Sequence, residues 1–216
     1  MTGRNLTGVL TRSIFAVTLA AASPVPASAH SLKELEDQLT AHEPYIQVVN
    51  RPAPDFALQD ADGHATSLKD LRGKVVVLYF IYASCPDVCP LLSEKIAEIQ
   101  QQINTTPMRD IVAFVAVTTD PERDTSQVLR DYGPAHGLDP ANWRFLTSGV
   151  DHPTATRELA KAYGLEFTPM GDGTQMHGLV THVIDKSGNL RARFHGLKFK
   201  DISLILYVNA LTNDNH

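Results

Sequence analysis

The stretch VVVLYFIYASCPDVCPLLSEKIAEI, residues 75–99, holds both cysteines of the 216-residue chain, Cys85 and Cys89. Its first part is a continuous run of β-branched and aromatic residues, which predicts a central strand within residues 74–84 that is buried on both faces. Apolar residues then recur at helical spacing and predict a helix over about residues 90–103. Because a proline suits the first turn of a helix, we expect Cys89 at the helix start and Cys85 in the loop before it.

The two cysteines lie where a thiol can become reactive. The positive end of a helix dipole favours negative charge, so it lowers the pKa of a thiol and stabilises the thiolate. A thiolate attacks disulfides and binds soft metal ions, and the spacing lets both sulfurs face one point. A structural disulfide is the alternative, but closing so short a loop should stabilise the fold by only roughly 2 kcal/mol. A redox pair and a metal site are therefore the favoured interpretations of Cys85 and Cys89.

Residues 1–29 have the pattern of a secretory signal peptide. They combine a basic start, an apolar run over residues 14–22 and an Ala-Ser-Ala end, with cleavage expected after Ala29. The apolar run is shorter than the roughly 20 residues of a membrane span, so an uncleaved anchor is a minority interpretation, as is a mitochondrial transit peptide, which the Ser and Thr content of the segment would also allow. We expect an exported protein, in a bacterial periplasm, where disulfides persist. The formal net charge of −5 argues against binding to nucleic acid.

The remaining chain divides into an N-terminal segment, residues 30–53, and a domain, residues 54–216. The segment is expected to form a short amphipathic helix or a mobile arm, and then a proline-marked lead-in. The domain begins with a β-hairpin over residues 56–73. Further predicted elements are a buried strand (109–120), a loop and helix (120–137), a short strand (142–147), a helix (151–165), a Gly-rich exposed loop (166–177), a hairpin (178–196) and a last helix (199–211). This order predicts an α/β, thioredoxin-like fold with a central mixed sheet flanked by helices and an extra N-terminal β-hairpin.

Several motifs follow one another along the chain: CPDVCP, TDPERDT, NWRFLTSG and ELAKAYG, then a histidine eleven residues before Gly188 of a hairpin turn. In these motifs the chain resembles the Sco/SenC family from about Pro54 to Leu206. The resemblance implies a thioredoxin-like fold and copper bound by Cys85, Cys89 and one histidine. It also implies a role in assembling the copper centre of cytochrome c oxidase, as a copper donor, as a thiol–disulfide reductant, or as both.

The chain has nine histidines, and the family pattern selects one of them. In the family the ligand precedes the hairpin strand, and counting back eleven residues from Gly188 gives His177. His182 lies five residues further on, so in a strand it would face the opposite way, and we expect it to be structural. Two thiolates and an imidazole suit Cu(I) through sulfur and can hold Cu(II) with nitrogen present. Zinc accepts the same donors but usually takes a fourth ligand.

Other polar or soft side chains near these positions are expected to have structural roles. Asp87 accepts hydrogen bonds at the helix start, contacts a partner or is solvated. Asp124 fits an N-cap, with Gln127 at the capping-box position. Capping and a local ion pair account for the charged residues of 120–124, so none of them is expected to be a ligand. Met176 is a soft donor, but methionine more often fills gaps in packing.

The sequence therefore predicts a copper metallochaperone that passes its ion to the apo copper-centre domain of cytochrome c oxidase or to another exported copper protein. A copper source or a thiol reductant would be a further partner. The alternative is a thiol–disulfide oxidoreductase that reduces the cysteines of the client, or a redox or copper sensor. Thioredoxin-type oxidoreductases usually carry C-x-x-C and a cis-proline before the facing strand. Here the spacing is C-x-x-x-C and His177 stands where that proline would be, which favours a metal site.

Overall fold

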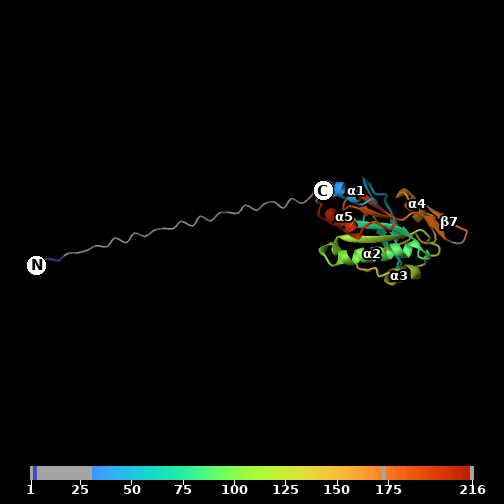
Figure 1. The fold of residues 1–216 in the computed structure, drawn as a ribbon. Coiled ribbons are helices and arrows are strands. Elements are labelled where there is room, and N and C mark those ends of the chain that lie inside the picture. Colours follow the sequence, from blue (N-terminus) through green and yellow to red (C-terminus); the bar gives the residue numbers. More distant parts are fainter. Residues whose placement is uncertain (1, 4–30, 172–173, 215–216) are drawn as a thin grey trace.

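The computed structural model describes residues 2–3, 31–171 and 174–214 of the chain (Figure 1). Apart from residues 2–3, the predicted signal peptide lies outside the described residues. The centre of the fold is a six-stranded mixed sheet in the order β1-β10-β9-β4-β5-β6. Its strands are β1 (Ile46–Pro52), β4 (Val75–Ile81), β5 (Val112–Thr118), β6 (Trp143–Leu146), β9 (Val180–Ile184) and β10 (Asn189–His195).

Helices cover both faces of this sheet. They are α1 (Leu32–His42), α2 (Val88–Asn104), α3 (Ser126–Ala135), α4 (Ala155–Ala162) and α5 (Asp201–Asn213), with a short 3-10 helix, η1 (Pro107–Asp110). Figure 1 shows α2 and α3 on one side of the sheet and α4 on the other. The expected α/β architecture, a mixed sheet flanked by helices, is therefore present.

The central strand β4 shows why the sequence has an unbroken apolar run. All seven of its residues are buried, and it pairs in parallel with β5 and antiparallel with β9. Successive side chains point to opposite faces, so alternate residues enter two separate apolar cores. Val75, Val77, Tyr79 and Ile81 pack with α2, α3 and α5, whereas Val76, Leu78 and Phe80 pack with α4. Burial on both faces explains the unbroken apolar run, in which the hydroxyl of Tyr79 is satisfied by a hydrogen bond from Trp143 Nε1.

Two small hairpins lie outside the six-stranded sheet. The predicted N-terminal hairpin is formed by β2 (Ala57–Gln59) and β3 (Ala65–Ser67). The second hairpin, β7 (Phe167–Pro169) with β8 (Gln175–His177), replaces the exposed Gly-rich loop that the sequence predicts over residues 166–177. That prediction was wrong because three-residue strands are too short to give a period-2 pattern.

Residues 46–52 also depart from expectation. The proline-marked lead-in contains the edge strand β1, which pairs antiparallel with β10, so part of the segment 30–53 belongs to the sheet. A proline is tolerated at an edge strand because its missing N–H faces away from the ladder. Residues 32–42 form the helix α1, which packs against α5.

The two ends of β4 face different parts of the molecule. Its last residue, Ile81, leads into the cysteine loop. The β9–β10 turn lies at the other end, where Lys186 donates a hydrogen bond to the carbonyl of Thr212 near the end of α5. Ser31, at the start of α1, lines the same groove as Asn213. The chain therefore begins its folded part, at α1, near the end of the sheet opposite the cysteines. The two ends of β4 are about 20 Å apart at the usual rise per strand residue.

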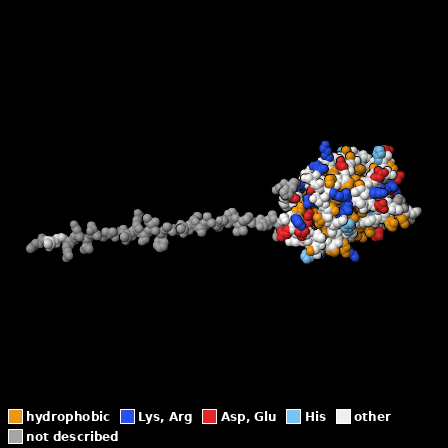
Figure 2. Space-filling view, turned by 90° about the horizontal axis from the view of Figure 1, so that it is seen from above, with side chains coloured by type: hydrophobic (Ala, Val, Ile, Leu, Met, Phe, Trp, Pro, Cys, Tyr) orange, Lys and Arg blue, Asp and Glu red, His pale blue; other side chains and the backbone are white. Residues whose placement is uncertain are grey.

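The surface carries charges of both signs. On the face shown in Figure 2, Lys and Arg side chains are interspersed with Asp and Glu side chains. Within the described ranges, no helix has both the length and the apolar character needed to cross a bilayer.

Candidate metal centre

The cysteines are positioned by the end of β4 and the start of α2. The chain turns after Tyr82, whose carbonyl accepts a hydrogen bond of 3.2 Å from the backbone N–H of Cys85. The helix begins at Val88, two residues before the expected start, so Cys89 lies in its first turn. Cys89 is fully buried and Cys85 is 6% exposed, and both are free thiols. The strand and the helix therefore fix both sulfurs in place.

His177 reaches the same place from the end of β8. It pairs across the hairpin with Phe167, and the two rings stack with centroids 4.4 Å apart. The ring of Tyr82 meets the imidazole edge-on at 5.9 Å. Nδ1 lies 3.1 Å from the carbonyl of Gly178, which can only accept, so Nδ1 carries the proton. Nε2 is left with its lone pair, and this is the nitrogen that points toward Cys89.

Three donor atoms converge here. The sulfurs of Cys85 and Cys89 and a ring nitrogen of His177 all lie within 4.8 Å of one another. The distance between Cys89 Sγ and His177 Nε2 is 3.8 Å. A soft ion bound at about 2.3 Å from sulfur and about 2.0 Å from nitrogen would separate the two donors by about 3.8 Å at an angle near 120°. The donor set thus fits one shared soft ion.

The environment treats the two thiols differently. Burial opposes ionisation of Cys85, but hydrogen bonds from the backbone of Asp87 and from the thiol and backbone of Cys89 outweigh burial and lower the pKa of Cys85. Burial raises the pKa of Cys89, and negative charge on Cys85 raises it further. The thiol favoured as thiolate is therefore the one in the loop, toward which the N–H groups at the helix start point. Burial also lowers the pKa of His177, which favours the neutral, metal-binding ring.

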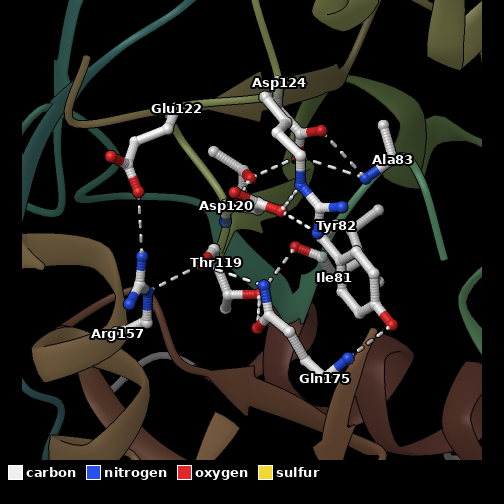
Figure 3. Close-up of polar contacts among 11 residues, drawn as sticks. Ile81, Tyr82, Ala83, Thr119, Asp120, Glu122, Asp124, Arg157 and Gln175 are labelled. Atoms are coloured by element: carbon white, nitrogen blue, oxygen red, sulfur yellow. Dashed lines mark hydrogen bonds and ion pairs between the residues drawn. The ribbon is translucent and has the colours of Figure 1, made fainter. Parts of the chain in front are cut away.

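The loop after β5 supports the cysteine loop. The carboxylate of Asp124 accepts a hydrogen bond of 3.1 Å from the N–H of Ala83 (Figure 3). It also accepts one from the hydroxyl of Thr118. Burial raises the pKa of Asp124. Asp124 was predicted to cap α3, but Thr125 is the N-cap, because the Asp124 side chain is buried between the two loops.

The remaining candidates of the sequence analysis are not near the three donors or do not face them. His182 is fully buried in β9, where Nε2 lies 3.3 Å from the carbonyl of Tyr163, so its predicted structural role fits its surroundings. Met176 is 64% exposed and lies on the face of β8 opposite His177 rather than filling a gap. Asp87 is exposed at the N-cap of α2, and its side chain makes no capping hydrogen bond. Asp120 and Arg123 form the expected local ion pair.

A second group of possible ligands, Asp60, Asp62 and His64, lies in the turn between β2 and β3. One carboxylate oxygen of Asp60 accepts the backbone N–H groups of Asp62 and His64 at 2.9 Å each. Arg130 pairs with Asp62 at 2.8 Å. These side chains already close a turn and an ion pair, so we assign them no metal.

Sequence reasoning missed three side chains around His177: Phe167, Tyr82 and Gln175. Phe167 carried no signal, because its stacking partner is set by the hairpin that the sequence did not predict. Tyr82 lies three positions before Cys85 in the sequence, but no sequence pattern indicates that it contacts β8. Gln175 lies two residues before His177, a spacing that would have placed both on one face had the strand been predicted.

Comparison with known proteins agrees with this arrangement. A family model described as SCO1/SenC matches residues 47–211. A SCO2-like protein of Rickettsia prowazekii (strain Madrid E) is 29% identical over 168 residues, which are 76% of this chain and 77% of that protein.

Solved structures share the fold. BsSco, described as a member of the Sco family of cytochrome c oxidase assembly proteins, has a TM-score of 0.67 and 22% identity, covering 77% of this chain and 96% of its own. ScoI of Arabidopsis thaliana, solved with copper bound, has a TM-score of 0.63 and 26% identity, covering 75% of this chain and 99% of its own. The predicted thioredoxin-like α/β fold is confirmed.

Proposed function

Because this chain belongs to the SCO1/SenC family, we propose that it is an exported metallochaperone that binds copper through Cys85, Cys89 and His177. It would deliver the ion to the copper centre of cytochrome c oxidase, or to another exported copper protein. The convergence of two thiols and one imidazole within 4.8 Å carries this proposal. The copper-bound relative, 26% identical, and the oxidase-assembly family to which BsSco is assigned support it.

The donor chemistry suits a carrier. Thiolate sulfur is a soft ligand that selects Cu(I), and the imidazole allows Cu(II) to be held as well. Ions displace protons from the donors on binding, so the lowered pKa of Cys85 favours loading at neutral pH. Three protein ligands leave one side of the ion open, and a receiving protein can add its own ligand there before the first carrier ligand leaves.

Export is part of the proposal. Residues 1–29 would be a signal peptide cleaved after Ala29, and the remaining chain would work in the bacterial periplasm. The basic start, the short apolar run and the Ala-Ser-Ala end support this assignment. Free thiols persist there only if they are kept reduced or occupied by metal.

The lowered pKa of Cys85 beside a second thiol also supports the runner-up function, thiol–disulfide exchange with a client. In that reaction the Cys85 thiolate attacks a client disulfide and releases one client thiolate. Cys89 then displaces the second client sulfur. The carrier ends with a Cys85–Cys89 disulfide, the client gains two thiols, and two electrons have passed to the client.

The two cysteines are expected to react with iodoacetamide in a fixed order. In the reduced, metal-free protein at pH 7.5, Cys85 should be alkylated at least about 10 times faster than Cys89, because it has the lower pKa and the more exposed sulfur. One equivalent of Cu(I) should protect both. Peptide mass spectrometry measures the rates, with urea-unfolded protein as the reference in which both react alike. Faster reaction of Cys89, or no protection by copper, would contradict the site.

Donation and reduction can be separated with a purified apo copper-centre domain as client. The copper-loaded carrier is mixed with the reduced client, and the metal-free dithiol carrier is mixed with the oxidised client. Copper found on the client after chromatographic separation supports delivery. If client thiols form in the second mixture and no copper moves to the client in the first, the reductase function replaces delivery.

A further inference from the structure

Gln175 attaches the β7–β8 hairpin, which holds His177, to the central sheet. Its side chain is 9% exposed and lies on the same face of β8 as His177. The amide oxygen accepts a hydrogen bond of 3.2 Å from the hydroxyl of Thr119, and the amide nitrogen lies 3.5 Å from the carbonyl of that residue. The backbone N–H of Gln175 donates to the hydroxyl of Tyr82 at 3.0 Å (Figure 3).

Both partners of Gln175 are firmly held. Tyr82 directly follows β4 and Thr119 directly follows β5, and the N–H of Thr119 donates to the carbonyl of Ile81 at 2.9 Å. Arg157 of α4 donates a further hydrogen bond of 3.0 Å to the carbonyl of Thr119. Figure 3 shows these residues as one connected group at the ends of the two central strands. Gln175 therefore contacts the ends of the two central strands. One of its partners, Tyr82, lies three residues before Cys85.

Buried side chains attach the hairpin to the rest of the domain: Phe167 of β7 packs in an apolar core, and Gln175 of β8 makes the polar contacts described above. β7 and β8 have three residues each and form a separate two-stranded sheet. An isolated two-stranded hairpin is marginally stable at best, so its placement depends on contacts outside its own ladder. The cysteines, by contrast, are fixed by β4 and α2. The distance between His177 Nε2 and the two sulfurs therefore depends on how the hairpin is attached.

We propose that Gln175 is a positioning residue of the metal centre: through Thr119 and Tyr82 it holds β8 so that the imidazole of His177 meets both sulfurs before the ion arrives. The effect on copper rests on the function proposed above, whereas the effect on the imidazole does not. A ligand that is already held in place loses less conformational entropy when the ion binds, and it dissociates from the ion more slowly. Groups bonded directly to a metal ligand typically change metal affinity 10–100-fold, and we expect Gln175, which acts through the strand, to fall at the low end of that range.

The test compares Gln175→Leu with the native protein. The leucine keeps the shape and the backbone bond to Tyr82 but removes both contacts to Thr119. We expect copper release to a chelator to become about 10-fold faster. Gln175→Leu combined with Thr119→Val should release copper no faster than Gln175→Leu alone, because both changes remove the same bond.

A second readout uses no copper. In the native metal-free protein the imidazole of His177 should show a single tautomer by nitrogen NMR, with the proton on Nδ1 bonded to Gly178. In Gln175→Leu the ring should report a mixture of tautomers and a mobile environment. Unchanged ring signals in that variant would overturn the proposal whatever copper does.

Gln100→Leu is the matched control. Gln100 is also a buried glutamine, bonded to Asp139 and Asn142, but it lies about 16 Å along α2 from Cys89. This variant should lose stability and yet release copper at the native rate. If it speeds release as much as Gln175→Leu does, the effect is general loosening and the proposal fails. If the native protein binds no copper, the proposed function fails, and the NMR result alone then decides the role of Gln175.

Discussion

Replacing His177 by alanine is expected to weaken copper binding by more than about 100-fold, because it removes one of three donors rather than an outer contact. The cavity left behind opens onto solvent, since the ring is only partly buried, so the fold should survive. Competition with a chelator of known copper affinity, under anaerobic and reducing conditions, measures the loss. The native protein should bind about one copper per chain.

Met176→Ala is the control for His177→Ala. It removes a soft donor one residue away that faces the other side of β8, so copper affinity should change by less than about 3-fold. His182→Phe should likewise leave the affinity near the native value. Equal losses in His177→Ala and His182→Phe would refute the assignment of the third ligand.

Replacing His182 by phenylalanine is expected to make the fold resist acid. Burial lowers the pKa of His182 to about 3, and the neighbouring charge of Arg193 opposes its protonation as well. Above pH 6.5 the ring is neutral in both the folded and the unfolded state, and no penalty arises. As the pH falls from 6.5 toward 3, only the unfolded chain takes up the proton, so stability is lost by about 1.4 kcal/mol per unit.

The expected loss of unfolding free energy depends on how far the pH falls below 6.5. Between pH 7.5 and pH 4 the native protein should lose about 3 kcal/mol more unfolding free energy than His182→Phe. The phenyl ring can take the place of the imidazole between Phe80 and Tyr163, and the Tyr163 carbonyl keeps its hydrogen bond from Arg193 at 3.1 Å. Urea titrations at both pH values measure the difference.

His152→Gln, which changes an exposed histidine, serves as the reference and should follow the native curve. Parallel pH profiles for the native protein and His182→Phe would show that protonation of His182 does not limit acid stability.

The parts of the fold that sequence predicted are those with a strong local signal. β4 and β5 are buried on both faces, and a nearly continuous apolar run is typical of such strands, so their presence and their buried state were predictable. α2 followed from apolar spacing, and the cysteines followed from their place between the two elements. His177 was predicted only from its distance to Gly188 in the family pattern. Physical reasoning on an isolated histidine would not have selected it.

The parts that sequence could not predict depend on tertiary contacts. β1 is an edge strand that ends in a proline. In a sequence a proline usually indicates the absence of a strand, although an edge strand tolerates it. Gln175 and Tyr82 are 93 positions apart, and no local pattern encodes their bond. The carboxylate of Asp124 is equally suited to a helix cap or to a buried loop contact, and only the fold decides between them.

The entry of the chain at the end of the sheet remote from the cysteines has a consequence for tethering. In Figure 1, α1 and β7 lie at opposite ends of the domain. If an upstream segment were retained in a lipid bilayer and the α1 end of the domain lay nearest to it, the end that holds β7 and the three donors would face the aqueous side. If the chain delivers copper as proposed, an anchored form and a released form would present the donors to a recipient from the same end of the domain and would differ in how far they can diffuse.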